Sequence, residues 1–229
     1  MTADALVLEV ADDVAVLTLN RPDKRNAMTL AMWRALPGLC RSVAEDPRAK
    51  VLVVAGAGEA FAAGADIGEF ETVYATRVST AEYFGAVAEA MEALAGLEKP
   101  TVARIRGACV GGGLGLALCC DLRIAAQDAR LGITPGKLGL TYSLADTKRL
   151  VDVVGPSRAK DVLFTGRILD AAEALSVGLV DAVVPVEALD DAVFAKVRQI
   201  AEASQWSART TKAIVRLILN GATTDTPQT

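Results

Sequence analysis

Histidine is absent from the 229 residues of this sequence. Without an imidazole, catalysis by Ser-His-Asp or Cys-His groups is excluded, because both depend on histidine to carry a proton near neutral pH. Zinc also loses the ligand that it most commonly takes in proteins. Any acid–base chemistry must therefore use other side chains.

Long apolar runs are absent as well. The longest, from Ala108 to Cys120, has 13 residues, four of them glycine, whereas a helix that spans a bilayer needs about 20 apolar residues. The first residues, Met1 to Asp4, show no basic region followed by an apolar stretch, which a secretory signal would require. We expect a cytoplasmic protein with no membrane partner.

Cysteine is sparse and follows no pattern. Metal-ligand spacing and the density of a disulfide framework are both missing from the four residues Cys40, Cys109, Cys119 and Cys120. They predict reduced, mostly buried thiols and no metal site. The net charge is only −4 and the basic residues are scattered, so the sequence offers no surface for nucleic acid.

The composition, 52% hydrophobic and 23% charged, supports one folded domain. Strand and helix patterns alternate first and helices dominate later, which predicts an α/β core over residues 1–185 and a C-terminal helical region over 186–229. The expected strands cover 6–10, 14–19, 51–55, 101–106, 121–125 and 180–184, and the expected helices cover 29–45, 79–97, 114–120, 144–153, 156–164, 170–176, 187–203 and 206–219. The first two strands are expected to form a hairpin, and the continuous apolar run 51–55 predicts a strand buried on both faces. Capping-box spacing makes Ser79 and Asp170 the expected N-caps of their helices.

Two glycine clusters follow expected strands. Residues 56–58 resemble half of a dinucleotide fingerprint, but the third glycine is missing and no lysine or hydroxyl residue follows, as a nucleotide phosphate loop would need. Residues 111–113 place bare backbone amides at the start of an expected helix, where unpaired N–H groups favour an anion or oxyanion. Close packing of that helix would also require glycines, so the residues alone leave both explanations open.

A resemblance separates these explanations. Residues 55–67 (AGAGEAFAAGADI) and 106–117 (RGACVGGGLGLA) resemble the crotonase family of enoyl-CoA hydratases and isomerases. Residues 19–27, 165–167 and 171–184 add agreement, so the resemblance spans roughly residues 6–220. It implies an α/β fold of the ClpP/crotonase-like kind, built of repeated ββα units with a C-terminal helical subdomain.

The resemblance implies an oxyanion hole made by the backbone amides of Ala65 and Gly112. Such donors stabilise the enolate that an acyl-CoA thioester forms when it loses an α-proton or CO₂, or accepts a nucleophile. Coenzyme A would be part of the substrate, and no cofactor would be bound covalently. The resemblance also implies contacts to the coenzyme, from Lys24 and Arg25 at the phosphates and from Ala27, Ala63, Asp66 and Ile67 near the adenine and pantetheine. The alternative for Lys24 and Arg25 is that they are solvated loop charges without a ligand.

Two departures from the family pattern bear on the reaction. The hydratases carry glutamates where this sequence has Gly115 and Pro135, and water addition needs a positioned base and acid, so neither an ordinary hydratase nor an ordinary isomerase is expected. Residues 133–142 resemble the methylmalonyl-CoA decarboxylase branch, in which a tyrosine matching Tyr142 contacts the substrate carboxylate. A half-buried loop aromatic is the alternative for Tyr142. The other acid–base candidates are Asp66, Glu69, Glu71, Asp146 and Tyr74.

The sequence therefore favours an acyl-CoA lyase or isomerase that works by enolate stabilisation, such as a decarboxylase of malonyl-type thioesters. The resemblance implies a homotrimer or homohexamer. The alternative is a catalytically silent acyl-CoA-binding or assembly protein. Family members commonly continue past the position of Thr229 with helices that close over the acyl pocket, and we expect such helices to be missing from this chain.

Overall fold

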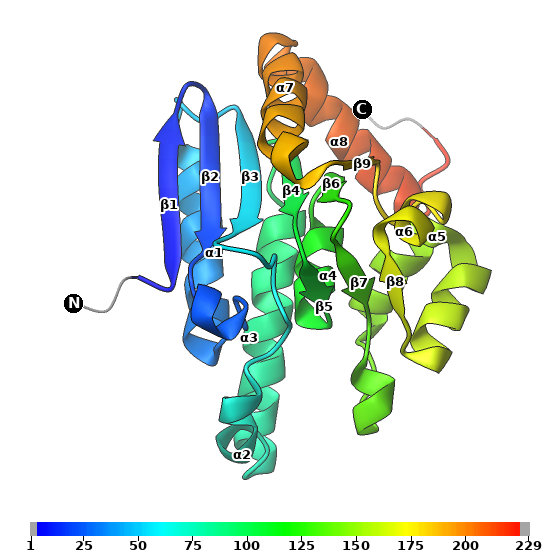
Figure 1. The fold of residues 1–229 in the computed structure, drawn as a ribbon. Helices are drawn as coiled ribbons and strands as arrows, with labels where there is room; N and C mark the ends of the chain where they lie inside the picture. Colours follow the sequence, from blue (N-terminus) through cyan, green and yellow to red (C-terminus); the bar gives the residue numbers. More distant parts are fainter. Residues whose placement is uncertain (1–3, 225–229) are drawn as a thin grey trace.

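Two β-sheets surrounded by helices make up the protein, whose computed structural model describes residues 4–224 (Figure 1). The larger sheet has the strand order β1-β2-β3-β4-β6-β9. Its first pair is antiparallel and all the other pairs are parallel. The strands are β1 (Leu6–Ala11), β2 (Val14–Leu19), β3 (Val51–Gly56), β4 (Thr101–Ile105), β6 (Leu122–Ala126) and β9 (Ala182–Val184).

The predicted hairpin at the start of the chain is confirmed. Asp12 and Asp13 join β1 to β2, and both have positive φ angles, 48° and 69°. Two such residues give the turn a twist that matches the right-handed twist of the flanking strands, which is why aspartate and asparagine are common there.

A smaller, three-stranded sheet was not predicted from the sequence. Its strands are β5 (Ala108–Val110), β7 (Arg130–Gly132) and β8 (Ile168–Asp170). The order is β5-β7-β8, with the first pair parallel and the second antiparallel. Each strand is only three residues long, which is too short for a hydrophobic alternation to be visible.

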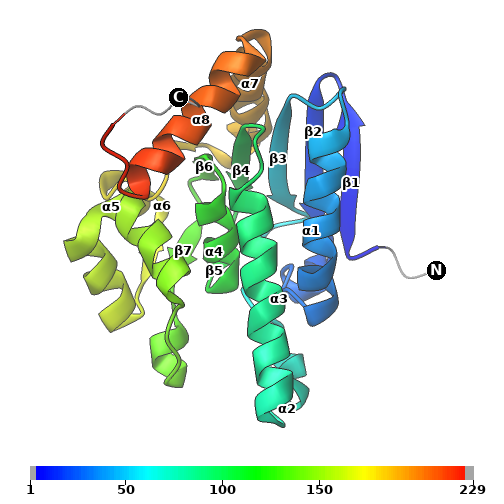
Figure 2. The same ribbon diagram turned by 180° about the vertical axis from the view of Figure 1, so that it is seen from behind.

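Helices cover both faces of the larger sheet. Figure 2 shows α1 (Leu30–Glu45), α3 (Arg77–Ala95) and α4 (Gly112–Cys119) on one face, and α7 (Leu189–Glu202) packs against β3, β4 and β6 on the other. The side chains of β3 alternate between two hydrophobic cores, one on each face of the sheet. Leu52 and Val54 belong to the core that also contains residues of α1, α3 and α4, whereas Val51 and Val53 belong to the core that also contains residues of α7. A strand buried on both faces is what its continuous apolar run predicted.

The remaining helices are α2 (Phe70–Val73), α5 (Leu144–Thr165), α6 (Ala171–Ser176) and α8 (Gln205–Leu219), with 3₁₀ turns η1 (Pro22–Lys24), η2 (Ile67–Glu69), η3 (Pro135–Leu138) and η4 (Val186–Ala188). The two helices expected on either side of Gly155 form α5, which is kinked there by a φ of 78°. The helix expected from Ser79 begins earlier, because Thr76 is the N-cap and Ser79 is its capping-box partner.

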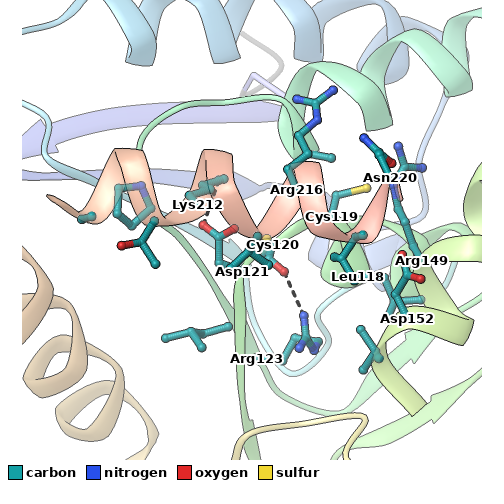
Figure 3. A pocket seen from close by; sticks show the side chains of 18 of the residues that line it. Leu118, Cys119, Cys120, Asp121, Arg123, Arg149, Asp152, Lys212, Arg216 and Asn220 are labelled. Atoms are coloured by element: carbon teal, nitrogen blue, oxygen red, sulfur yellow. Dashed lines mark hydrogen bonds and ion pairs between the residues drawn. The ribbon is translucent and has the colours of Figure 1, made fainter. Parts of the chain in front are cut away.

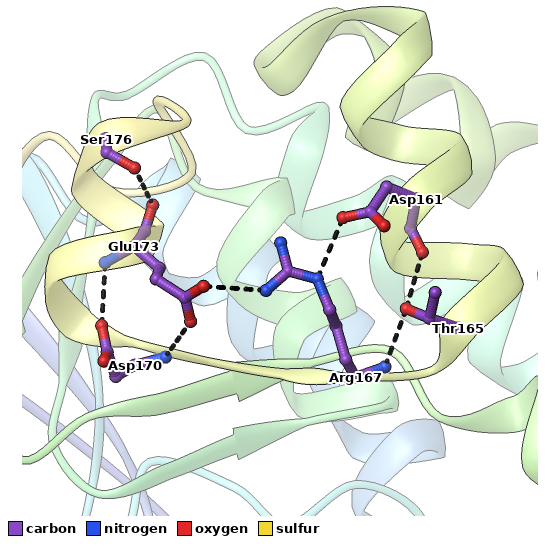
Figure 4. Close-up of polar contacts among 6 residues, drawn as sticks. All are labelled: Asp161, Thr165, Arg167, Asp170, Glu173 and Ser176. Atoms are coloured by element: carbon purple, nitrogen blue, oxygen red, sulfur yellow. Dashed lines mark hydrogen bonds and ion pairs between the residues drawn. The ribbon is translucent and has the colours of Figure 1, made fainter.

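Arg167 links the end of α5 to the start of α6 (Figure 4). Its guanidinium bonds Asp161 at 2.9 Å and Glu173 at 2.9 Å. Glu173 also forms the predicted capping box with Asp170, which confirms the predicted start of this helix. The segment 165–173 thus positions the edge strand β8 of the smaller sheet.

The four cysteines are free and buried, as expected. Burial raises the pKa of Cys40 to about 11 and that of Cys119 to about 12, and it also raises the pKa of Cys109 and of Cys120. These thiols are therefore protonated and poorly nucleophilic at neutral pH.

Between residues 4 and 224 no helix has the length and apolar character needed to cross a bilayer. In the same part of the chain, no cluster of three or more histidine, cysteine, aspartate or glutamate side chains is arranged to hold a metal ion.

Asn26 joins the loop after β2 to the loop after β3 and is fully buried. Its side-chain amide donates to the carbonyls of Ala57 at 2.9 Å and Ala60 at 2.7 Å, and its oxygen accepts from the backbone N–H of Arg21 at 2.9 Å. Both the nitrogen and the oxygen of its side-chain amide are therefore used in holding the two loops together.

We predict that Asn26→Asp lowers the free energy of unfolding by about 3 kcal/mol, because two buried carbonyls lose their donor and meet a carboxylate instead. Urea denaturation measures the loss. The matched change Asn20→Asp, which removes one exposed hydrogen bond to Asp4, should cost well under half as much. Equal losses in the two variants would contradict this role for Asn26.

Candidate active site

Two segments far apart in the sequence, 62–66 and 108–113, run side by side. The N–H of Ala62 donates to the carbonyl of Ala108 at 2.9 Å, and the N–H of Val110 donates to the carbonyl of Ala62 at 3.0 Å. These bonds form a short parallel bridge between Ala62 and Cys109. The two glycine-containing motifs singled out in the sequence are therefore joined directly.

Ala65 is held from its other side by Met28. The N–H of Met28 donates to Gly64 at 2.8 Å, and the N–H of Asp66 donates to Met28 at 2.9 Å. In such a parallel bridge the central residue turns its own N–H away from the strand that flanks it. The Ala65 N–H therefore faces away from Met28 and donates no hydrogen bond to any residue within 4–224.

Gly112 is the first residue of α4, so its N–H lacks a partner within the helix. It also donates to no other residue in the described part of the chain. A methyl group placed on Gly112 would lie 3.9 Å from the nitrogen of Ala65, and one on Gly64 would lie 3.6 Å from the nitrogen of Gly112. Two unused N–H groups are thus neighbours at a helix N-terminus, where the helix dipole favours negative charge.

Gly113 permits this close approach. A methyl group at this position would lie 2.3 Å from the carbonyl oxygen of Ala62 and 2.8 Å from its Cβ. The packing explanation for the glycine cluster is therefore confirmed at Gly113. The anion or oxyanion explanation, for which Gly112 presents a free amide, stays a prediction.

The residues predicted along the coenzyme lie in or beside the same two loops. Residues 20–27, which include Lys24 and Arg25, form a basic loop. The carbonyl of Arg25 accepts from the N–H of Ala63 at 2.9 Å, which joins the basic loop to the segment that carries Ala65. Lys24 and Arg25 are exposed, and neither forms an ion pair with another residue of 4–224. Ala27 is half-buried and lies next to Met28, whereas Ile67 is 75% exposed.

Asp66 is tied down in its own loop. Its carboxylate accepts from the N–H of Gly68 at 3.0 Å and bonds the guanidinium of Arg21 at 2.8 Å. Burial opposes its charge, but the hydrogen bonds from Arg21 and Gly68 outweigh that effect and lower the pKa of Asp66. An ionised, fully partnered carboxylate of this kind is a weak proton acceptor, and the contacts match a structural role.

Met91 of α3 occupies the space beside Gly115. A methyl group on Gly115 would meet the Met91 Cε at 2.6 Å and its sulfur at 3.3 Å. Met91 is only 3% exposed, so a thioether stands where the resemblance would place a glutamate side chain. This side of the candidate site is apolar.

Of the other acid–base candidates, two form hydrogen bonds or ion pairs within the fold and two lie exposed on α2 or at its end. Glu69 accepts from the N–H of Leu30 at 2.7 Å and so caps α1, and Asp146 is bonded to Arg149 at 2.9 Å. Glu71 lies exposed on α2, and Tyr74 is 39% exposed at the end of that helix.

Tyr142 reaches the candidate site from the loop before α5. It is half-buried, and its hydroxyl donates to the carbonyl of Gly111. Burial is the largest influence on this phenol and raises its pKa, so the hydroxyl keeps its proton at neutral pH. The structure therefore brings Tyr142 to the glycine turn, and its expected contact with a substrate carboxylate stays a prediction.

A cavity of about 810 Å³ lies elsewhere, at the far end of α4 (Figure 3). Gly112 begins this eight-residue helix, so the cavity is about 10 Å from the free amides. Its charged groups are paired, with Lys212 bonded to Asp121 at 2.8 Å and Arg149 to Glu92 at 2.9 Å. Among the described residues that line it, none is a predicted site residue.

The contacts of several residues that shape the site could not be predicted from the sequence, although Arg21 and Asn26 lie in the motif 19–27. Arg21 holds Asp66, Asn26 holds the basic loop, and the ring of Trp33 would lie 3.2 Å from a methyl group on Gly112. Met91 reads as one more core residue of an amphipathic helix. The roles of these residues depend on partners distant in the chain, which periodicity does not reveal.

We predict that Gly113→Ala destabilises the protein by about 2 kcal/mol, because the new methyl group must push the backbone of Ala62 away from α4. Gly85→Ala is the matched control, since nothing lies within 4 Å of the added methyl group on the exposed face of α3. That change should stabilise the helix by about 0.5–1 kcal/mol. Thermal unfolding of both variants checks the pair, and a neutral Gly113→Ala would contradict the close contact.

The chain matches the enoyl-CoA hydratase/isomerase family over residues 9–226. It is 35% identical over 215 residues to the crotonyl-CoA hydratase of Syntrophomonas wolfei, covering 93% of this chain and 82% of that protein. An enoyl-CoA hydratase/isomerase family protein from Hyphomonas neptunium superimposes with a TM-score of 0.95 at 45% identity, over 98% of this chain and 86% of that one. An enoyl-CoA hydratase from Bacillus anthracis gives 0.91 at 31% identity, over 96% and 85%. The predicted fold is confirmed, and the chain belongs to the enoyl-CoA hydratase/isomerase, or crotonase, family.

Proposed function

We propose that this protein binds an acyl-CoA thioester and stabilises the enolate formed from it at the backbone amides of Ala65 and Gly112. The observation that carries the proposal is that these two N–H groups lie close together and that neither donates to a residue of 4–224. Fixed donors aimed at one point stabilise a developing oxyanion without reorganisation, and each is worth about 10²- to 10³-fold in rate. Membership of the family supports an acyl-CoA as the molecule that supplies the carbonyl.

The basic loop supports the same ligand. Lys24 and Arg25 are exposed on a loop that is hydrogen-bonded to the segment of Ala65 through Ala63. Phosphate groups of coenzyme A would meet these cations while the thioester reaches the amides. An anchor remote from the reacting carbonyl helps to orient it.

The reaction that these residues favour is one that needs no carboxylate base. Gly115 has Met91 beside it instead of a glutamate side chain, and the nearby Asp66 and Glu69 already accept hydrogen bonds. In the decarboxylation of a malonyl-type thioester, the bond from the α-carbon to the carboxylate breaks and CO₂ leaves. The electron pair moves into the thioester as an enolate, which then takes a proton from water.

Parallel assays with methylmalonyl-CoA and crotonyl-CoA test the proposal. We expect release of CO₂ from methylmalonyl-CoA, together with hydration of crotonyl-CoA that is about 10²- to 10⁴-fold slower than acid–base catalysis by two carboxylates would allow. Hydration with a kcat above about 1 s⁻¹, an ordinary enzyme rate, would contradict the inference that Gly115 and Pro135 leave the protein without the carboxylates needed for water addition.

The loss of both hydratase glutamates, at Gly115 and Pro135, also favours a second candidate, a catalytically silent acyl-CoA-binding or assembly protein. Calorimetry that detects acyl-CoA binding, with no turnover of a panel of acyl-CoA thioesters, would support this candidate over the first. Failure to bind any CoA thioester would contradict both.

We also propose a homotrimer or homohexamer in the cytoplasm, as the family resemblance implies. The amphipathic helix α8 supports association, because Trp206 is 76% exposed and Ile218 is 60% exposed. Analytical ultracentrifugation measures the oligomeric state.

We predict that Lys24→Ala combined with Arg25→Ala weakens binding of butyryl-CoA about tenfold, equivalent to about 1.4 kcal/mol, because the phosphates lose two cations. Binding of S-butyryl-pantetheine, which lacks the adenosine phosphates, should not change. Isothermal titration calorimetry with both thioesters gives the comparison.

The pair Arg158→Ala and Lys160→Ala is the control for net charge. Both residues are exposed on α5, and neither forms an ion pair within the described residues. This control should bind both thioesters as the unaltered protein does. Equal weakening of the two thioesters by the Lys24 and Arg25 changes would rule out a phosphate contact.

A further inference from the structure

The free amide of Gly112 belongs to the same peptide group as the carbonyl of Gly111. That carbonyl accepts two hydrogen bonds, from the hydroxyl of Tyr142 and from the N–H of Gly115 at 3.0 Å. The N–H of Gly111 is also used, since it donates to the carbonyl of Gly132 at 2.8 Å. Every polar group around this peptide is therefore fixed except the N–H that faces the site.

The backbone at this point cannot hold its orientation by conformational preference alone. Gly111 has a φ of 56° and a ψ of −122°, a region that only glycine enters without strain. Glycine is also the residue with the most conformational freedom, so the direction of the next N–H depends on external contacts. The hydrogen bond from Tyr142 is one such contact, and it comes from a loop outside both amide-bearing segments.

We propose that Tyr142 is a positioning residue, which aims and polarises the Gly111–Gly112 peptide and so sets the strength of the Gly112 N–H as an oxyanion donor. A hydrogen bond to an amide carbonyl draws electron density toward the oxygen and makes the N–H of the same amide a stronger donor, by about 10–30% per bond. The inference rests on the proposed function, and it gives Tyr142 a role that does not require contact with the substrate.

The surroundings of the hydroxyl favour this role over a contact with a substrate carboxylate. A phenol has one proton to donate, and here the carbonyl of Gly111 takes it. A methyl group on Gly115 would lie 3.9 Å from the hydroxyl oxygen, and Met91 fills the adjoining space, so the hydroxyl lies against the first turn of α4. Its raised pKa, caused by burial, keeps the proton in place.

The experiment compares the protein with Tyr142→Phe, which keeps the ring and removes only the hydroxyl. The probe is butyryl-CoA labelled with ¹³C at the thioester carbonyl, which has no second carboxylate. Isotope-edited infrared spectroscopy records how far binding lowers the carbonyl stretching frequency, and this shift reports polarisation by the amides. We expect a clear shift in the unaltered protein and a smaller one in Tyr142→Phe, with the affinity for butyryl-CoA little changed.

Turnover gives a second readout. With methylmalonyl-CoA as the substrate, kcat should fall about tenfold in Tyr142→Phe while KM stays nearly constant. This loss is smaller than that expected on removing a whole oxyanion donor, because the N–H of Gly112 itself remains. Replacing Tyr142 by 4-aminophenylalanine, whose amine can donate to Gly111, should restore both the shift and kcat. Thr141→Val is the control, since this exposed neighbour forms no side-chain hydrogen bond within residues 4–224.

The outcomes distinguish a failure of the role proposed for Tyr142 from a failure of the proposed function. A carbonyl shift that is equally large in Tyr142→Phe would overturn this inference and leave the proposed function standing. A defect confined to malonyl-type thioesters, with a raised KM, would also overturn it and assign the hydroxyl to the substrate carboxylate. Absence of any shift in the unaltered protein would contradict the proposed function itself. If Tyr142→Phe fails to fold, the 4-aminophenylalanine variant with normal shift and turnover still supports the inference, and one that folds but loses the shift overturns it.

Discussion

The close contact between the segment 62–66 and the start of α4 is the constraint on which the rest of the site depends. Two hydrogen bonds join Ala62 to the strand β5, and the missing side chain of Gly113 lets the helix approach to within contact of that backbone. Without this approach, the amides of Ala65 and Gly112 would be separate loop groups exposed to water. With it, two donors share one small volume at a helix N-terminus, where an anion is favoured.

The scaffold explains why such a contact is stable. The parallel strands β3 and β4 of the larger sheet lead into the segments that carry the two amides, and both faces of this sheet are covered by helices. The small sheet then aligns β5 with β7, so that Gly132 can accept from Gly111. Each loop is thus tied to a strand on one side and to a neighbouring loop on the other, and little of the site depends on mobile side chains.

Much of this arrangement could be predicted from the sequence, for identifiable reasons. The apolar run 51–55 is long enough to show a doubly buried strand, and Asp170 with Glu173 has the spacing of a capping box. The two amide positions came from motif resemblance and not from periodicity, and the structure places them together. The strands β5, β7 and β8 were missed because each has three residues and pairs with a partner chosen by tertiary structure.

Other features lay beyond sequence reasoning because they depend on contacts across the fold. Ser79 looked like an N-cap, but Thr76 takes that position and Ser79 completes its capping box, a choice between two similar residues that local spacing does not decide. The side chain beside Gly115 belongs to Met91, from a helix more than twenty residues earlier, and no local pattern links the two. The partner of Tyr142 was likewise invisible, since a loop tyrosine reveals nothing about which carbonyl it meets.

The central claim is that one thioester oxygen lies between two main-chain N–H groups, and a crystal structure with a non-reactive acyl-CoA analogue measures this most directly. The account predicts that the carbonyl oxygen lies about 2.7–3.1 Å from the nitrogens of both Ala65 and Gly112. A bound analogue whose carbonyl oxygen contacts neither nitrogen, or only one of them, would contradict it.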